Sequence, residues 1–184
     1  RKFIWDAMAV DIAGKRIMAY SYYPKEGNPL WEQFSTRAVA HTLKTYSKYT
    51  IDYIYPQATS VHAKSIGMEY PMICFNFGRP NIDGSYSDDV KFGMIGVIIH
   101  EIGHNWFPMI VGSNERLYGW MDEGFNSFIN DICTKEFNDG EYYGCVTSEG
   151  GCPLINGQKK NQSLENLTSK ILTKIGFVIE SPTI

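Results

Sequence analysis

The sequence predicts an α+β domain in which a small mixed sheet packs against two helices. Apolar residues alternate loosely through residues 3–23, with Gly14 at a turn, which is typical of two paired strands. Further along, apolar residues recur every three or four positions, as on the buried face of a helix. One such segment contains the motif His100-Glu101-Ile102-Gly103-His104. The 184 residues are enough to bury the core of one domain.

The other elements can be placed in order along the chain. Trp31, Phe34, Ala38 and Thr42 share one helical face, so a helix is expected from Trp31 to about Tyr49. Beyond it we expect extended segments at Ile51–Tyr55, Thr59–Ile66 and Met72–Phe77, a loop at Arg79–Asp89, and helices at Val90–Phe107 and Trp120–Phe137.

The character of the chain changes after Asn138. Repeated Gly and Pro residues interrupt any periodic pattern, and helical spacing returns only between Leu164 and Ile175. We therefore expect the folded domain to span residues 1–138, followed by a weakly patterned tail over residues 139–184.

Composition excludes several functions. The 17 basic and 20 acidic side chains give a net charge of −3 without any basic block, so binding to nucleic acid is not expected. The longest apolar run, Met94 to Ile99, is far shorter than the roughly 20 residues of a membrane span, so we expect a soluble protein. The sequence leaves the oligomeric state and the compartment open, with export to the periplasm or the extracellular space as one option.

The strongest chemical signal is the His-Glu-x-x-His motif. In a helix, positions i and i+4 lie about 40° apart around the axis, so the imidazoles of His100 and His104 project side by side and can bind one ion. Glu101 lies on the adjoining flank, where it can reach a water molecule on the metal without binding the metal itself. The apolar residues around the motif predict a buried helix, and buried polar groups need a partner. The alternative is a pair of hydrogen-bonded core histidines without a metal.

A third ligand follows the motif at a short distance. Residues 105–122 separate His104 from Glu123, which lies in the segment Trp120-Met121-Asp122-Glu123-Gly124-Phe125. Two helices joined by a short connector can bring Glu123 to the open side of the metal. Two histidines and one glutamate are a ligand set of catalytic zinc sites, with the fourth position left for water. We therefore predict one Zn²⁺ ion; the alternative is that Asp122 and Glu123 only complement a helix dipole.

This ligand set predicts hydrolysis. A zinc ion lowers the pKa of a bound water toward about 7 and polarises a carbonyl group. Glu101 would accept the proton of that water and deliver it to the leaving amine. Asn130 and Asp131, two turns past Glu123, are candidates for anchoring the imidazoles, although the same positions would suit a solvated helix face.

These residues resemble the aminopeptidase N family of gluzincin zinc metallopeptidases. The resemblance rests on His-Glu-Ile-Gly-His-Asn-Trp-Phe at residues 100–107, on the spacing to Glu123, and on Trp-Met-Asp-Glu-Gly-Phe at residues 120–125. Upstream, Gly-Met-Glu-Tyr-Pro at residues 67–71 is similar to the family's Gly-x-Met-Glu-Asn exopeptidase signature. The resemblance covers about residues 3–138 and implies a thermolysin-like fold, with a small mixed sheet packed on the two zinc-site helices.

The resemblance also implies how a substrate binds. Glu69 would bind the free α-amino group of a peptide, and Gly67 and Met68 would line the pocket for its first residue. A carboxylate is a suitable partner for a cationic amine. Ile66 and Tyr70 depart from the family signature, and the alternative is that Glu69 is an ordinary surface acid at a strand start.

We therefore predict a zinc metallopeptidase, specifically an aminopeptidase that releases N-terminal residues from peptides with a free N-terminus by zinc-activated water. The family's oxyanion-stabilising Tyr has no counterpart, because no Tyr follows Tyr143. This predicts a catalytic-domain fragment or truncated relative with impaired activity, since losing one oxyanion donor costs about 10²–10³ in rate. The alternatives are an endopeptidase-like zincin and a non-catalytic, zinc-stabilised binding module.

Overall fold

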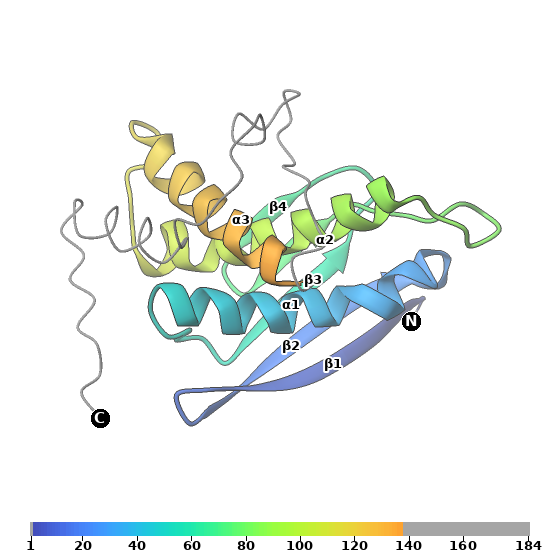
Figure 1. Ribbon diagram of the computed structural model, residues 1–184, viewed down its shortest axis with the longest axis horizontal. Coiled ribbons are helices and arrows are strands. Elements are labelled where there is room, and N and C mark those ends of the chain that lie inside the picture. The colour runs from blue at the N-terminus through green and yellow to red at the C-terminus, as the bar shows by residue number, and fades with distance from the viewer. Residues whose placement is uncertain (1, 138–184) are drawn as a thin grey trace, which may run out of the picture. The chain divides into compact units, whose positions relative to one another are not determined.

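A five-stranded mixed sheet forms the base of the computed structural model, which describes residues 2–137 (Figure 1). Its strand order is β1-β2-β3-β5-β4, so β1 and β4 are the edge strands. The β1–β2 and β4–β5 pairs are antiparallel, whereas β2–β3 and β3–β5 are parallel. The strands are β1 (Phe3–Ile12), β2 (Lys15–Pro24), β3 (Gln57–His62), β4 (Met68–Tyr70) and β5 (Ile73–Asn76).

The first two strands form the hairpin that the alternating pattern predicts. Ala13 and Gly14 both have positive φ at its turn, and the Gly14 amide donates a hydrogen bond to Asp11 Oδ1 at 3.2 Å. Glycine suits such a position because it has no Cβ to oppose the left-handed conformation. Val10 and Ile17 are paired across the hairpin and lie in the core.

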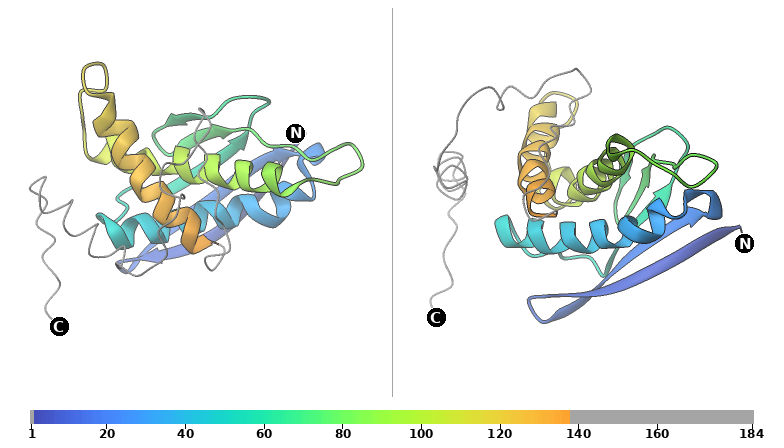
Figure 2. Two further views of the ribbon diagram at one scale, coloured as in Figure 1. Left: turned by 45° about the horizontal axis from the view of Figure 1, so that its top comes forward. Right: turned by 45° about the vertical axis from the view of Figure 1, so that its right-hand side comes forward.

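In the described residues, two α-helices pack on one face of this sheet and a third packs on those two. They are α1 (Leu30–Tyr49), α2 (Asp88–Gly103) and α3 (Phe125–Phe137). Helix α1 contacts β1, β2 and β3, and α2 contacts β3, β4 and β5, so the two lie side by side over the sheet (Figures 1 and 2). Helix α3 packs against both α1 and α2. At the start of α2, the Ser87 side chain accepts a hydrogen bond from the Val90 amide, which is a standard N-cap.

Helix α2 ends at Gly103, earlier than the predicted Phe107. A π-helical segment, η2 (Asn105–Ile110), continues the chain, and Phe107 within it has non-helical φ and ψ of −126° and 109°. Pro108 explains this break, because proline disfavours the α conformation in the residue before it. A second π-helical segment, η3 (Trp120–Gly124), precedes α3.

The extended segment predicted at Ile51–Tyr55 is not a strand. Tyr53 within it is instead buried against Trp106, with ring centroids 4.8 Å apart. The predicted boundary between residues 138 and 139, and the helix predicted at residues 164–175, lie outside the described residues. Among residues 2–137, no helix has the length and apolar character required to cross a membrane.

Candidate metal centre

Helix α2 places His100 and His104 one turn apart near its C-terminal end. Their Nε2 atoms lie 3.2 Å from each other, and the two rings meet edge to face. The His104 side chain is 1% exposed and that of His100 is 26% exposed. Ile98, Ile99 and Ile102 of the same helix are buried in the core, so this end of α2 is held by apolar packing.

Glu123 approaches these two imidazoles from η3. Its Oε2 atom lies 3.2 Å from His100 Nε2 and 3.7 Å from His104 Nε2. Tetrahedral coordination at metal–ligand distances of about 2.0–2.1 Å separates neighbouring ligand atoms by roughly 3.3 Å. The three atoms therefore have the spacing that a single metal ion requires, and these residues are a group that could hold one.

Two oxygen atoms fix the orientation of the His104 ring. The Phe107 carbonyl lies 2.8 Å from His104 Nδ1, and Asp122 Oδ1 lies 2.9 Å from the same nitrogen. A carbonyl oxygen and a carboxylate oxygen can only accept, so the ring proton belongs on Nδ1 and the Nε2 lone pair faces His100 and Glu123. His104 Nδ1 donates its hydrogen bond to the Phe107 carbonyl. The buried Asp122 Oδ1 therefore lies beside the ring without accepting a hydrogen bond.

A second contact fixes the turn of α2 that carries His100. Asn126 Nδ2 donates to the His100 carbonyl at 2.9 Å and lies 3.4 Å from His100 Nδ1. The Tyr46 hydroxyl in turn donates to Asn126 Oδ1 at 2.9 Å. Gly103 gives both groups room, because a Cβ there would overlap Asn126 Oδ1 and the Tyr46 hydroxyl. This buried network joins α1, α2 and α3 at the site.

The prediction that Asn130 and Asp131 anchor the imidazoles is wrong. In residues 2–137, the anchoring contacts come from Asp122, Asn126 and the Phe107 carbonyl. The prediction counted α-helical turns from Glu123, but η3 is π-helical and α3 begins only at Phe125. Asp122 directly precedes Glu123, and Asn126 follows it by three positions. A polar side chain at residue 122 or 126, so close to Glu123 in sequence, was the signal that could have identified Asp122 and Asn126 as anchoring residues.

Glu101 lies beside the imidazoles in a buried position. It is 6% exposed, and burial raises the pKa of its carboxyl group to about 8, with further contributions from Glu69 and Glu123. Glu69, Glu101 and His104 form a second group of closely spaced donor atoms. Gly67 lies directly against Glu101, because a Cβ at residue 67 would overlap Glu101 Oε1.

The charges around the two imidazoles are unbalanced. Glu69, Glu123 and Asp122 all act on Glu101, and each of them raises its pKa. Burial and the neighbouring His104 lower the pKa of His100 to about 4, so that imidazole is neutral at pH 7. Clustered carboxylates in a partly buried site are unfavourable unless a cation compensates them. The residues present therefore fit a bound cation on electrostatic as well as geometric grounds.

The residues predicted to contact substrate lie on or next to the edge strand β4. Glu69 pairs with Cys74 of β5, and its carboxylate belongs to the second group of donor atoms. Met68 is half-buried in the same strand, directly after Gly67. The structure thus brings Gly67, Met68 and Glu69 to the side of the site where Glu101 lies.

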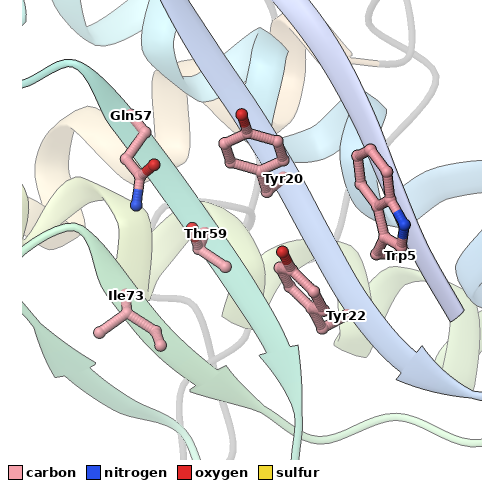
Figure 3. Close-up of a pocket in the computed structure, with 6 residues that line it drawn as sticks. All are labelled: Trp5, Tyr20, Tyr22, Gln57, Thr59 and Ile73. Atoms are coloured by element: carbon pink, nitrogen blue, oxygen red, sulfur yellow. The ribbon is translucent and has the colours of Figure 1, made fainter. Parts of the chain in front are cut away.

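A separate pocket lies on the face of the sheet that the helices leave uncovered. Figure 3 shows its lining residues on four neighbouring strands: Trp5, Tyr20, Tyr22, Gln57, Thr59 and Ile73. These side chains alternate along the strands with buried ones such as Ala19, Ala58 and Cys74. The pocket is lined by no acid, histidine or cysteine, so it offers neither the metal ligands nor the carboxylate base that zinc-dependent hydrolysis uses.

Comparison with known proteins identifies relatives that are named as aminopeptidases. No family model matches the chain. Aminopeptidase B of Mus musculus and of Homo sapiens are each 33% identical to it over 113 residues, which covers 59% of this chain and 16% of the relative. The chain therefore corresponds to about one sixth of the length of the curated relatives that it matches.

Solved structures share the fold. The M1 zinc metallopeptidase from Deinococcus radiodurans superimposes with a TM-score of 0.55 at 16% identity, covering 74% of this chain and 29% of that one. Legionella pneumophila aminopeptidase A, solved in complex with aspartic acid, gives a TM-score of 0.60 at 12% identity and covers 73% and 16%.

Proposed function

We propose that this chain forms the zinc-binding catalytic part of an aminopeptidase. Its sequence and its fold relate it to the gluzincin aminopeptidase N family. The observation that carries the proposal is the convergence of His100 Nε2, His104 Nε2 and Glu123 Oε2 at 3.2 to 3.7 Å. The relatives named aminopeptidase B support the reaction class. The substrates would be peptides with a free N-terminus.

His100, His104 and Glu123 would hold one zinc ion. When bound, zinc polarises the scissile carbonyl and makes a water molecule more acidic. The chain's own contribution is to hold the ligands in place before the metal arrives. Asp122 and the Phe107 carbonyl keep the Nδ1 proton of His104 turned away from the site, so that Nε2 remains a free lone pair.

Glu101 would be the general base, and Glu69 would bind the substrate. Glu101 follows His100 directly in the motif, and its carboxylate lies close to His104 and Glu69, which supports a role beside the three proposed ligands. It would accept a proton from the attacking water and later donate it to the leaving amine. Glu69 would accept hydrogen bonds from the substrate's α-ammonium group, and Gly67 and Met68 would line the pocket for the first residue. The ammonium group would also offset the negative charge that Glu69 and Glu101 place close together.

We assign the fold more specifically to the thermolysin-like class. The support is a mixed sheet whose edge strand β4 runs beside the helix that carries the two histidines. An edge strand in this position leaves backbone groups free to pair with an extended peptide. The proposal thus places the substrate between β4 and the metal ligands.

The test compares amino-acid amides that have a free amino group with their N-acetylated forms. We expect hydrolysis of the free-amine substrate that is restored by zinc and abolished by a chelator. Glu101→Gln should retain zinc but lose turnover. Equal cleavage of the acetylated substrate would favour an endopeptidase-like zincin, and zinc retention without turnover in the unaltered chain would indicate a binding module.

A further inference from the structure

Asn105 connects the end of the metal-binding helix to the hairpin that carries Glu69. The residue is fully buried and directly follows His104. Its Nδ2 atom donates to the Ile102 carbonyl at 2.9 Å, near the last turn of α2. Its Oδ1 atom accepts a hydrogen bond from the Met72 amide at 2.8 Å, across 33 positions of sequence. One side chain amide therefore spans the gap between α2 and the β4–β5 turn.

Met72 occupies a conformation that its own sequence does not favour. It lies in the turn between β4 and β5 with a φ of +65°. A side chain larger than that of glycine rarely adopts this left-handed region, which persists only where surrounding contacts impose it. The Met72 amide is bound by Asn105, and the Met72 carbonyl accepts a hydrogen bond from the Thr59 amide at 2.9 Å. These two long-range bonds hold the turn.

The position of Glu69 depends on this turn. Strand β4 has three residues and pairs only with β5 in the described sheet, with Glu69 opposite Cys74. Carboxylate oxygens of Glu69 and Glu101 and a ring nitrogen of His104 all lie within 4.8 Å of one another, so β4 brings Glu69 beside the metal ligands. The bonds of Asn105 to the Met72 amide and to the Ile102 carbonyl tie the turn that follows β4 to the last turn of α2.

We infer that Asn105 is a positioning residue, which holds Glu69 at the distance from the metal ligands that recognition of a free amino group requires. The inference rests on the proposed function and deepens it. Asn105 itself contacts no substrate in this scheme. It acts through the backbone of the turn, and its effect should appear in substrate recognition.

The test compares Asn105→Ala, Asn105→Asp and Asn76→Ala in the full 184-residue chain. Asn105→Asp keeps an acceptor oxygen for the Met72 amide. Asn76→Ala is the matched control, because Asn76 is another fully buried amide but bonds to Ser60 and Cys74. Three quantities are measured: the hydrogen exchange rate of the Met72 amide, the thermal unfolding midpoint, and the ratio of kcat/KM for free-amine over N-acetylated amino-acid amide.

In Asn105→Ala we expect the Met72 amide to exchange about 10-fold faster or more, and the ratio to fall about 10-fold through a higher KM for the free amine. A 10-fold loss is of the size expected when the charge-assisted hydrogen bond between Glu69 and the substrate's ammonium group is weakened. Asn105→Asp should retain slow exchange and most of the ratio. Asn76→Ala should lower the unfolding midpoint while leaving both the exchange rate and the ratio at their original values.

Two results would overturn the inference. The first is unchanged exchange of the Met72 amide in Asn105→Ala, which would show that Asn105 does not hold the turn. The second is faster exchange with an unchanged ratio, or an equal fall of the ratio in Asn76→Ala, which would show that the turn does not set amine recognition. If the unaltered chain fails to hydrolyse either substrate, the proposed function fails, and the exchange rate still decides separately whether Asn105 holds the turn.

Discussion

The two sides of the metal centre are built differently. His104 is 1% exposed and comes from the buried end of α2, whereas the Glu123 side chain is 60% exposed and comes from η3. Trp120, in the same segment, is 61% exposed. Two ligands are thus held by the core before any metal binds, and the third comes from the surface. The difference indicates that metal affinity depends mainly on the core side of the centre, because preorganised ligands lose little freedom on binding.

The largest expected effect is the loss of zinc binding in His104→Ala. This change removes a preorganised ligand and leaves the buried Asp122 without the imidazole beside it. We expect the affinity to fall well beyond the factor of about 10–100 that is typical for losing an outer contact to a ligand. Glu123→Ala should cause a smaller loss, measured for both variants by competition with a chromophoric chelator. A greater loss in Glu123→Ala would contradict the distinction between the two sides.

Asp122→Asn tests the carboxylate beside the His104 ring. We expect zinc affinity to fall about 10–100-fold, because the substitution removes the negative charge next to the Nδ1 proton. The matched control is Asp131→Asn, which changes the acid that the sequence suggested for this role. Asp131 is partly buried, and burial raises its pKa, but it makes no contact with either imidazole in the described structure. Equal losses in the two variants would mean that general electrostatics, rather than the contact, controls affinity.

Substitution of Gly103 tests how tightly the core side is packed. Gly103→Ala would force a Cβ against Asn126 and Tyr46, so we expect the free energy of unfolding to fall by about 1–3 kcal/mol. Gly93→Ala lies in the same helix, where a Cβ meets no atom within 4 Å. There we expect a stabilisation of about 0.5–1 kcal/mol, since alanine is the better helix former. Urea unfolding gives the free energy of unfolding of each variant. Stabilisation in Gly103→Ala as well as in Gly93→Ala would show that the residues around Gly103 are not tightly packed.

The smallest expected effect concerns His41, a half-buried histidine outside the centre. Burial lowers its pKa below 6.5, although its ring bonds to the Cys133 carbonyl at 3.0 Å. The unfolded chain therefore binds a proton at His41 before the folded chain does, and stability falls as the pH decreases below 6.5 toward the lower folded pKa. In His41→Gln this part of the pH dependence should disappear. The free energy of unfolding is measured at pH 7.5 and pH 5.5 for the unaltered chain and for His41→Gln. An equal difference between the two pH values in both proteins would exclude His41 as the source of this pH dependence.

Local patterns in the sequence were sufficient for much of the fold. The hairpin follows from alternating residues around Gly14, and α2 begins at Asp88, two residues before the predicted Val90. The two histidines and Glu101 were identified from their spacing within one helix. These features involve residues close in sequence, and short-range geometry determines them.

Other features depend on contacts that no local pattern reports. The need for glycine at residue 103 comes from Tyr46 and Asn126, which reach it from two other helices. Asp122 contacts His104 from η3, a π-helical segment, and an α-helical count of turns from Glu123 does not predict this contact. The Asn105–Met72 bond joins residues 33 positions apart. Only the packed structure reveals such contacts.

The most direct test of the metal centre is X-ray absorption at the zinc edge, on the chain loaded with one equivalent of zinc. We predict two imidazole nitrogens at about 2.0–2.1 Å together with oxygen ligands at similar distance, and the loss of one imidazole in His104→Ala. Sulfur scattering at about 2.3 Å, which would place zinc on the cysteines, or a ligand shell that is unchanged in both His104→Ala and Glu123→Ala, would contradict the assignment.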